Sequence, residues 1–398
     1  MISKLLTVKR PPDVVVTGIG LATPLGLTTL TTWQNLLAGK SAIALRQPFL
    51  DLDPMPLAMM GKRPAILTEM ARSLARIAWL DAGLGEIKGQ QNKQPVDREC
   101  GVVVGSSRSH LQTWEKLATE QRQSPGQVSA GWLGPLGSAP AVTIAQTVGA
   151  SGPVLAPMAA CATGIWAIAQ AADLIRTGQC QRVIAGAVEA PITALTLAGF
   201  RRMGALASTG CYPFDTQREG FVLGEGGALM VLESATDAAR RGTAKIYGRI
   251  LSAGITNDSH HVSSFDPSYA MGRRAVELCL ERSGLHPETI DAVHVHGTST
   301  AQNDQMEAHL IESMLPEKVP VMASKGATGH TLGASGAVTV ALSLLSLCEQ
   351  QLTPCVGLRS PAFALNFVRQ ATPAAIETIL CFSFGFGGQN AVLAISRD

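Results

Sequence analysis

The stretch APMAACATGIWAI, residues 156–168, sets one cysteine, Cys161, among small residues just before an apolar helical pattern. The pattern predicts a helix over 164–176 that stops at Gly178. Alanine and glycine around the cysteine let the backbone turn sharply and let a substrate approach closely. A thiol at a helix N-terminus meets the positive end of the helix dipole, which favours the nucleophilic thiolate. A buried cysteine that only packs fits this stretch equally well.

Short β-branched runs that end in small residues alternate with helical patterns along the chain. Several runs are continuously apolar, which is typical of strands buried on both faces. The alternation predicts an α/β fold with helices packed on both faces of a sheet. The expected strands are 14–18, 100–106, 182–189, 228–234, 245–254, 292–299, 319–325 and 391–397. The expected helices are 31–39, 65–82, 164–176, 270–282 and 334–348.

The composition points to a large buried core and away from nucleic-acid or membrane partners. Hydrophobic residues make up 46% of the 398 residues and charged residues 16%, against about 25% charged in a typical soluble domain. A formal net charge of +2 leaves no basic footprint for nucleic acid. No uninterrupted apolar run approaches the roughly 18 residues of a membrane span.

Cysteine usage and the N-terminal residues predict a cytoplasmic protein. The 8 cysteines are scattered without a CxxC pair, so they suit neither a zinc site nor a disulfide framework. The first residues, MISKLLTVKR, lack the apolar run and cleavage site of a secretion signal. In TGIGLATPLG (17–26), the third glycine position of a dinucleotide-binding turn falls on Thr23. We therefore expect neither a metal nor a nucleotide cofactor.

Two histidines stand in glycine-containing turns in the second half of the chain. His296 lies toward the end of an expected strand that runs into a turn, in VHVHGTST (293–300), and His330 shares SKGATGHTLGASGA (324–337) with Lys325. Active sites of α/β proteins form at the carboxyl ends of strands, so both histidines are candidates for one site. Each histidine taken alone is also compatible with a structural role.

Several motifs follow one another along the chain in a recognisable order. In one of them, SFGFGG (383–388), alternating Phe and Gly bring backbone N–H groups and aromatic rings to one turn. The motifs are AACATG (159–164), PFDTQREGFVLGEGG (213–227), HGTST (296–300), KGATGHTLGASGA (325–337) and SFGFGG (383–388). Their order and spacing resemble β-ketoacyl-[acyl-carrier-protein] synthases, most closely the type II, KAS II-like condensing enzymes of the thiolase superfamily. The resemblance runs from residue 14 to the C-terminus.

The resemblance implies a thiolase fold, with two similar βαβαβαββ halves in a five-layered αβαβα arrangement, usually as a homodimer. On that template, residues 1–245 form the half with the nucleophilic cysteine. Residues 246–398 form the half with the two catalytic histidines. Many glycines and few charges suit a body with two stacked, buried sheets.

The resemblance also implies an acyltransferase, a 3-oxoacyl-[acyl-carrier-protein] synthase. Cys161 would take an acyl group from an acyl-carrier-protein thioester. His296 and His330 would stabilise the negative charge that develops as malonyl-acyl-carrier protein loses carbon dioxide. The carbanion would then attack the acyl group, giving a 3-oxoacyl-acyl-carrier protein two carbons longer in fatty-acid chain elongation.

Supporting roles follow from the same resemblance. The backbone N–H groups of Cys161 and Phe386 match an oxyanion hole. Phe386 also matches the gate beside the acyl pocket, and Phe384 would line the same turn. Thr298 and Thr300 match hydroxyls that bind the phosphopantetheine arm. Because that arm belongs to the carrier protein, no cofactor is implied.

The chain departs from the family pattern at Lys325, which matches a lysine that supports His330. The family usually places a glutamate fourteen residues after this lysine, and here that position is Thr339. We therefore expect Lys325 to pair elsewhere or to be positioned differently. The carrier protein is acidic, so docking should use a basic patch. The candidates by position are Lys62, Arg63, Arg201 and Arg202.

Two other readings stay open. One is a specialised ketosynthase that acts on polyketide or unusual lipid chains, which would differ in pocket shape. The other is a non-catalytic partner subunit that only shapes a heterodimer. Such subunits generally lose the nucleophile, whereas this chain keeps Cys161 together with both histidines. A thiolase proper is disfavoured, because Cys381 lies outside the turn where a second catalytic cysteine would be needed.

Overall fold

The computed structural model describes residues 12–85, 100–127, 130–243 and 245–398. Residues 1–10, on which the expectation about secretion rests, lie outside the described residues. Within those ranges, ten strands form one mixed sheet. In the first half of the chain their spatial order from the edge is β5 (Val154–Leu155), β4 (Cys100–Gly105), β6 (Arg182–Glu189), β7 (Gly226–Ser234) and β1 (Val14–Ala22). In the second half it is β10 (Val321–Met322), β9 (Ala292–His294), β13 (Thr378–Gly385), β14 (Gln389–Ser396) and β8 (Gly248–Asn257).

The two halves of the sheet share one pairing pattern. Strands β5, β4 and β6 are parallel, and β7 runs antiparallel to both β6 and β1. Likewise β10, β9 and β13 are parallel, and β14 runs antiparallel to both β13 and β8. The halves join where Val14, Val15 and Val16 of β1 pair with β8. The duplication that the sequence does not display is therefore present in the strand order.

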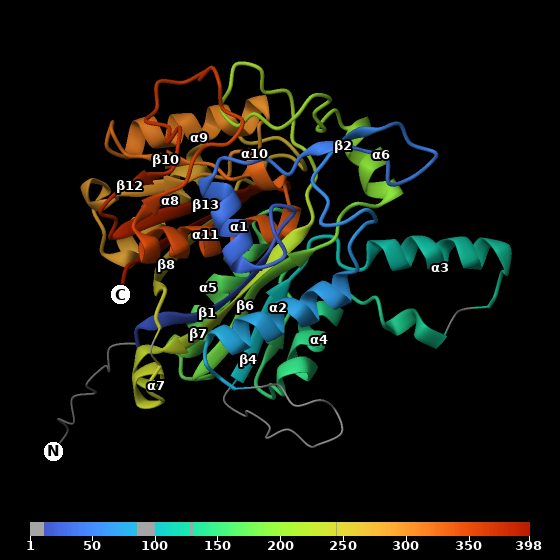
Figure 1. Cartoon of the computed structure of the whole chain (residues 1–398), viewed down its shortest axis with the longest axis horizontal. Coiled ribbons are helices and arrows are strands. Elements are labelled where there is room, and N and C mark those ends of the chain that lie inside the picture. Colours follow the sequence, from blue (N-terminus) through green and yellow to red (C-terminus); the bar gives the residue numbers. More distant parts are fainter. Residues whose placement is uncertain (1–11, 86–99, 128–129, 244) are drawn as a thin grey trace.

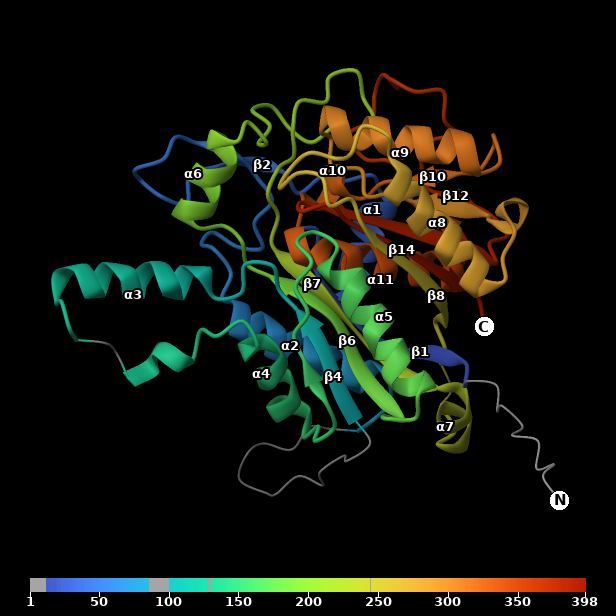
Figure 2. The same ribbon diagram turned by 180° about the vertical axis from the view of Figure 1, so that it is seen from behind.

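Helices form three layers around the two half-sheets (Figures 1 and 2). In the middle, α5 (Thr163–Arg176) packs directly on α11 (Ser335–Glu349), where a side chain on Gly164 would come within 2.3 Å of the Ala337 nitrogen. Helices α2 (Leu67–Asp81) and α4 (Ala139–Val148) cover the outer face of the first half. Helices α8 (Ala270–Ser283) and α9 (Ala301–Met314) cover the outer face of the second half. The expected five layers are confirmed.

Alternation along the strands explains this layering. In β6, Val183 and Ala185 belong to the central core with α5 and α11, whereas Ile184 and Val188 pack under α2 and α4. Strands with apolar residues on both faces are typical of sheets covered on both sides. The stretch Leu332–Glu349 is apolar and long enough for a membrane helix, but 89% of it is buried inside the protein.

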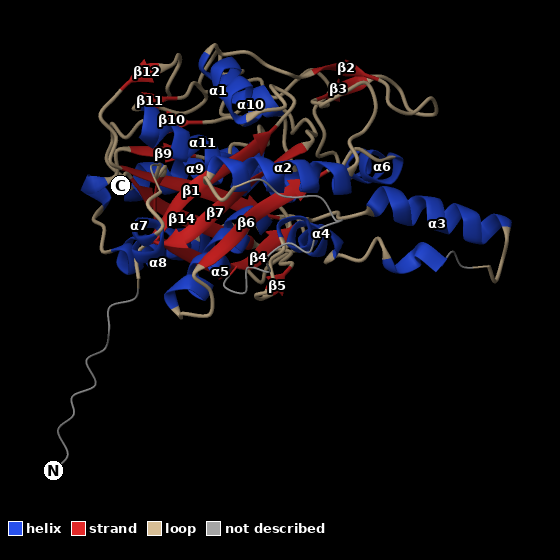
Figure 3. Ribbon diagram, turned by 60° about the horizontal axis from the view of Figure 1, so that its bottom comes forward, coloured by secondary structure: helices blue, strands red, loops and turns tan. Residues whose placement is uncertain are grey.

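The remaining elements are short or peripheral. They are α1 (Thr29–Leu37), β2 (Ala44–Arg46), β3 (Met55–Leu57), α3 (Leu111–Gln123), α6 (Ala194–Arg202), α7 (Ala235–Arg240), α10 (Lys325–Thr328), β11 (Gln351–Leu352), β12 (Thr372–Pro373) and three 3₁₀ turns, η1 (Ala130–Leu133), η2 (Pro287–Thr289) and η3 (Leu332–Ala334). Helix α3 projects from the body with no buried residue on it (Figures 1 and 3).

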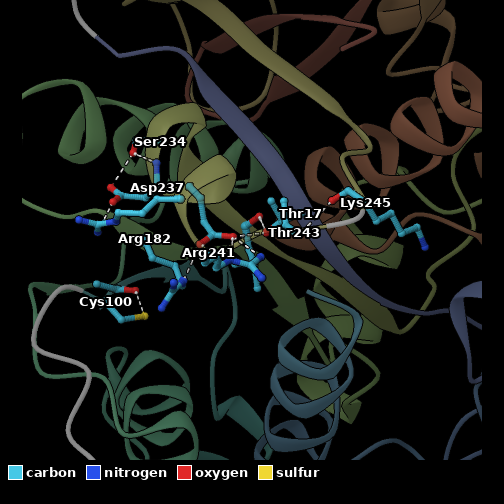
Figure 4. A network of polar contacts seen from close by, with 12 residues as sticks. Thr17, Cys100, Arg182, Ser234, Asp237, Arg241, Thr243 and Lys245 are labelled. Atoms are coloured by element: carbon cyan, nitrogen blue, oxygen red, sulfur yellow. Dashed lines mark hydrogen bonds and ion pairs between the residues drawn. The ribbon is translucent and has the colours of Figure 1, made fainter. Parts of the chain in front are cut away.

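A buried ion-pair network ties the first half of the chain together (Figure 4). The carboxylate of Glu233 on β7 is fully buried and accepts hydrogen bonds from Arg182 (2.9 Å), Arg241 (3.0 Å) and Thr17 (2.7 Å). Burial raises the pKa of Glu233, but the bonds from Arg241 and Thr17 and the charge of Arg182 outweigh it, so the pKa is lowered. The network joins β1, β6 and β7 to the residue that follows α7.

Candidate active site

Cys161 lies in the turn between β5 and α5, two residues before the helix begins at Thr163. The turn is tight, because Ala160 has a left-handed backbone conformation with φ of 46°. This conformation is energetically unfavourable for an L-amino acid and persists only where neighbouring groups hold it. The Thr163 hydroxyl holds it, accepting from the Ala159 nitrogen (2.9 Å) and donating to the Ala160 carbonyl (2.7 Å). The thiol is 9% exposed and lines a pocket of about 340 Å³.

Both predicted histidines lie close to this thiol, and His330 contacts it. The Nε2 atom of His330 lies 3.2 Å from Cys161 Sγ, and the rings of His296 and His330 meet edge to face with centroids 5.2 Å apart. Backbone hydrogen bonds to residues 222–224, just before β7, fix His330, whose nitrogen donates to the Val222 carbonyl at 2.7 Å. The structure thus places Cys161, from the first half of the chain, next to His330 from the second.

Lys325 contacts His296, whereas the family resemblance placed it in support of His330. Its Nζ donates to the carbonyl oxygen of His296 and lies 3.3 Å from His296 Nδ1. A lysine can only donate, so Nδ1 accepts and the ring proton sits on Nε2. The predicted support of His330 by Lys325 thus differs from the geometry, in which the direct contact is with His296.

Glu307 on α9 is an acidic residue near Lys325 that the sequence analysis did not identify, and burial raises the pKa of its carboxyl to about 7. Its carboxylate accepts from the backbone nitrogens of His296 and Gly297, each at 2.6 Å. It is fully buried, and its charge raises the pKa of Lys325 while burial lowers it more, leaving the pKa below its usual value. The signal available in the sequence was an acidic residue on the helix that follows HGTST.

The electrostatics of the thiol correct one expectation. Burial raises the pKa of Cys161 to about 11, although Lys325 and a backbone hydrogen bond from Phe386 lower it. The helix dipole therefore does not make a resting thiolate, because desolvation dominates in so closed a site. Burial and Lys325 hold the pKa values of His296 and His330 well below their usual value. The resting site thus holds a neutral thiol and two neutral imidazoles.

The SFGFGG turn closes the site over Cys161. A side chain on Gly385 would lie 3.0 Å from the Cys161 nitrogen, so only glycine lets the turn approach this closely. The Phe386 nitrogen thereby reaches the thiol, and the Phe386 ring packs toward Phe200 with centroids 6.3 Å apart. Phe384 is buried, and its ring faces His296 at 6.3 Å.

Thr298 and Thr300 line the same pocket, with their hydroxyls 2.9 Å apart. Phe221, which the sequence analysis did not single out, packs edge to face on His330 with centroids 5.2 Å apart. The loop Ser263–Phe265 forms another wall of the pocket. Arg201 and Arg202 lie at the end of α6, next to the pocket residue Met203.

The ligand atoms of Cys161, His296 and His330 lie within 4.8 Å of one another, close enough for one metal ion. A thiolate and two imidazoles are ligands that zinc accepts. The ammonium of Lys325, however, donates to the His296 ring and places a positive charge beside the cluster. That positive charge opposes a cation here, and the arrangement suits a nucleophile flanked by hydrogen-bond donors.

Comparison with known proteins gives the family. The sequence profile of the "Beta-ketoacyl synthase, N-terminal domain" matches residues 12–58 and 63–238, and that of the "Beta-ketoacyl synthase, C-terminal domain" matches 247–359. The 3-oxoacyl-[acyl-carrier-protein] synthase 2 of Mycobacterium tuberculosis (strain H37Rv) is 34% identical over 422 residues, covering 99% of this chain and 100% of that protein. The protein of the same name from Staphylococcus aureus (strain COL) is 32% identical, covering 96% and 98%.

Solved structures agree with this assignment. A chain from a complex of a type II polyketide acyl-carrier protein with its hexaketide-bound ketosynthase (AntDE:AntF) superimposes with a TM-score of 0.89 at 26% identity, covering 98% of this chain and 100% of that one. A beta-ketoacyl synthase from Burkholderia phymatum STM815 superimposes with a TM-score of 0.87 at 25% identity, covering 97% and 100%. The fold is that of the thiolase-type ketosynthases, and the chain belongs to the beta-ketoacyl synthase family.

Proposed function

We propose that this protein condenses an acyl group held on Cys161 with malonyl-acyl-carrier protein, in fatty-acid chain elongation. The observation that carries the proposal is the 3.2 Å contact between Cys161 Sγ and His330 Nε2, with His296 facing the same pocket. The named activity of the relatives, 3-oxoacyl-[acyl-carrier-protein] synthase, supports the same reaction.

In the first half-reaction, Cys161 sulfur attacks the carbonyl carbon of an acyl thioester. The thiol proton passes to His330 Nε2, which lies within hydrogen-bond reach. The carrier thiolate leaves and takes its proton from solvent, so the proton received by His330 stays on Nε2 while the acyl chain stays on Cys161. The backbone N–H groups of Cys161 and Phe386 would bind the oxyanion of the tetrahedral intermediate.

In the second half-reaction, malonyl thioester binds with its carbonyl oxygen toward both imidazoles. The carbon–carbon bond to the carboxylate breaks, carbon dioxide leaves, and the electron pair moves to the thioester oxygen as an enolate. Donation from Nε2–H of His296 and of His330 stabilises that charge. The enolate carbon attacks the acyl carbonyl, and collapse of the adduct releases the Cys161 thiolate, which takes back its proton from His330 Nε2. The proton on Nε2 of His296 is secured because Lys325 occupies Nδ1.

The carrier protein and a second copy of this chain are the partners we propose. Thr298 and Thr300, at the pocket wall, would receive the phosphopantetheine arm, and Arg201 and Arg202 would meet the acidic carrier surface. Strand β5 supports a dimer, because it is the edge of the sheet and Val154, Leu155 and nearby Met158 are 37%, 38% and 69% exposed. No metal or bound cofactor enters the proposed chemistry.

Two further assignments complete the proposal. Residues 1–245 would form the half that supplies the nucleophile, and residues 246–398 the half that supplies the histidines. We place the protein in the cytoplasm, because a reducing compartment suits its 8 scattered cysteines. The structural match to a polyketide ketosynthase favours a second candidate substrate class, a polyketide chain on the same cysteine.

The test is a condensation assay with malonyl-acyl-carrier protein and acyl-carrier proteins of graded chain length. A 3-oxoacyl product two carbons longer, with carbon dioxide released in equal amount, is the expected result. A product only from oxidised, polyketide-type chains would select the second candidate. Absence of product with every chain, from protein that is folded and dimeric, would overturn the proposal.

A further inference from the structure

His294 is a buried titratable residue to which the mechanism above assigns no part. It ends β9, is fully buried, and lies two residues before His296 on the same strand edge. Its Nδ1 lies 2.9 Å from the Ser343 hydroxyl of α11, and its Nε2 lies 3.1 Å from the Ser324 hydroxyl. A neutral imidazole has one donor and one acceptor, and a hydroxyl can serve as either, so both ring nitrogens are satisfied.

The Ser324 contact leads directly to Lys325. Ser324 is the residue before α10, and its carbonyl accepts from the Ala327 and Thr328 nitrogens at 2.9 and 3.0 Å, which builds the turn that starts with Lys325. The adjacent residues 324 and 325 therefore contact His294, at the end of β9, and His296, just beyond it, respectively. This double attachment fixes where the Lys325 ammonium meets His296 Nδ1.

The surroundings of His294 hold no negative charge on the α11 side. Thr339 and Ser343 are four residues apart, so they share a face of that helix, and both are buried hydroxyl residues. Burial, and then the charge of Lys325, lowers the pKa of His294 to about 3. The ring is therefore uncharged at neutral pH. It connects α11 to the turn that starts with Lys325, which we call the lysine turn, without adding a second positive charge.

We propose that His294 is a positioning residue: its neutral imidazole links Ser343 of α11 to Ser324 and so holds Lys325 in register with Nδ1 of His296. In this chain it takes the place of an acidic partner for Lys325 on α11, where Thr339 stands. The inference rests on the proposed function for its kinetic consequence. The effect acts through Lys325, so it should appear in decarboxylation more than in acylation.

The kinetic test compares His294→Leu, which removes both hydrogen bonds, with His294→Gln, whose longer side chain can still reach Ser324. We expect His294→Leu to lower kcat for malonyl decarboxylation at least tenfold, with KM and the rate of Cys161 acylation within about twofold. His294→Gln should recover most of that loss. Should His294→Leu fail to fold, Ser324→Ala removes only the contact to the lysine turn and should lower kcat in the same direction.

The matched control is Ser346→Ala. Ser346 lies on α11, as Ser343 does, and is equally buried, but its hydroxyl has no hydrogen-bond partner among the described residues. This variant should keep the wild-type rates of both half-reactions. An equal loss in Ser346→Ala and Ser324→Ala would contradict a specific role for the bridge.

A second measurement does not depend on the substrate. Nitrogen-15 NMR of histidine-labelled resting protein reports which ring nitrogen of His296 carries the proton. We expect the Nε2–H form in the wild type and a mixture of both forms in His294→Leu. A pure Nε2–H form in His294→Leu, with unchanged decarboxylation, would overturn the inference. If the wild type decarboxylates no malonyl thioester but the tautomer shifts as expected, the positioning role stands and only the proposed function fails.

Discussion

His330 and Cys161 lie 169 positions apart in the sequence, and the Nε2 atom of one lies 3.2 Å from the sulfur of the other. The cysteine lies in the turn before α5, and the histidine lies in the loop after α10, where backbone hydrogen bonds to Val222 and Gly224 of the first half hold it. The reactive pair therefore exists only when the two halves are packed together. The pair is neutral at rest, and this determines how the nucleophile responds to pH.

Alkylation of Cys161 should rise about tenfold per pH unit between pH 6 and pH 9, without a plateau. The sign follows from burial, which raises the pKa of Cys161 to about 11, so the reactive thiolate fraction keeps growing throughout this range. The measurement is the rate of iodoacetamide labelling of the Cys161 peptide by mass spectrometry. A plateau below pH 8 would mean that a thiolate already exists at rest.

His296→Ala should lower malonyl decarboxylation by about 100-fold or more, the cost of removing one oxyanion donor. Acylation of Cys161 should change only a few-fold, because His296 is not the residue in contact with the sulfur. His330→Ala should likewise lose more decarboxylation than acylation, with a larger fall in acylation than His296→Ala shows. Rapid-quench measurement of each half-reaction separates these effects. Equal loss of both half-reactions in both variants would refute the division of labour.

Thr339→Glu tests whether Lys325 can take an acidic partner on α11. Thr339 is 1% exposed and Lys325 is already bonded to His296, so we expect the new carboxylate to be buried without a full partner. It should lower the free energy of unfolding by about 1–3 kcal/mol, measured by urea denaturation. Thr339→Gln, which matches the size without the charge, is the control. A Thr339→Glu variant more stable than Thr339→Gln would show that Lys325 pairs with it.

Glu233→Ala should destabilise the fold by about 3 kcal/mol, because it leaves Arg182 and Arg241 without the carboxylate that both contact. The matched control is Glu377→Ala. Glu377 forms an exposed pair with Arg397, with 68% of its side chain accessible, and its loss should cost under about 1 kcal/mol. Denaturant midpoints of the two variants provide the comparison. Similar midpoints would show that the buried network contributes little.

Much of the fold could be predicted from apolar patterning. The strands expected at 100–106 and 182–189 and the helices expected at 65–82 and 164–176 appear at nearly the same bounds. Helix α3 was not expected, because it has no buried face and therefore no apolar period. Strand β13 was also missed, because its glycine-containing end was interpreted as a turn alone.

The three central residues of the site could be predicted from the sequence, but the residues that support them could not. Cys161, His296 and His330 stood out because each lies in a turn of small residues at the end of a strand or start of a helix. Glu307 and His294 did not, since their roles depend on backbone nitrogens and hydroxyls brought close only by packing. The pKa of Cys161 also depends on burial, which the helix-terminus argument left out.

The most direct test of the account is the intact mass of the protein, measured first with acyl-acyl-carrier protein alone and then after adding malonyl-acyl-carrier protein. We predict an acyl adduct on the Cys161 peptide that disappears in the second step as the 3-oxoacyl product forms, and no adduct in Cys161→Ala. An adduct on another residue, or condensation by Cys161→Ala at a rate near wild type, would contradict the assignment of Cys161 as the nucleophile.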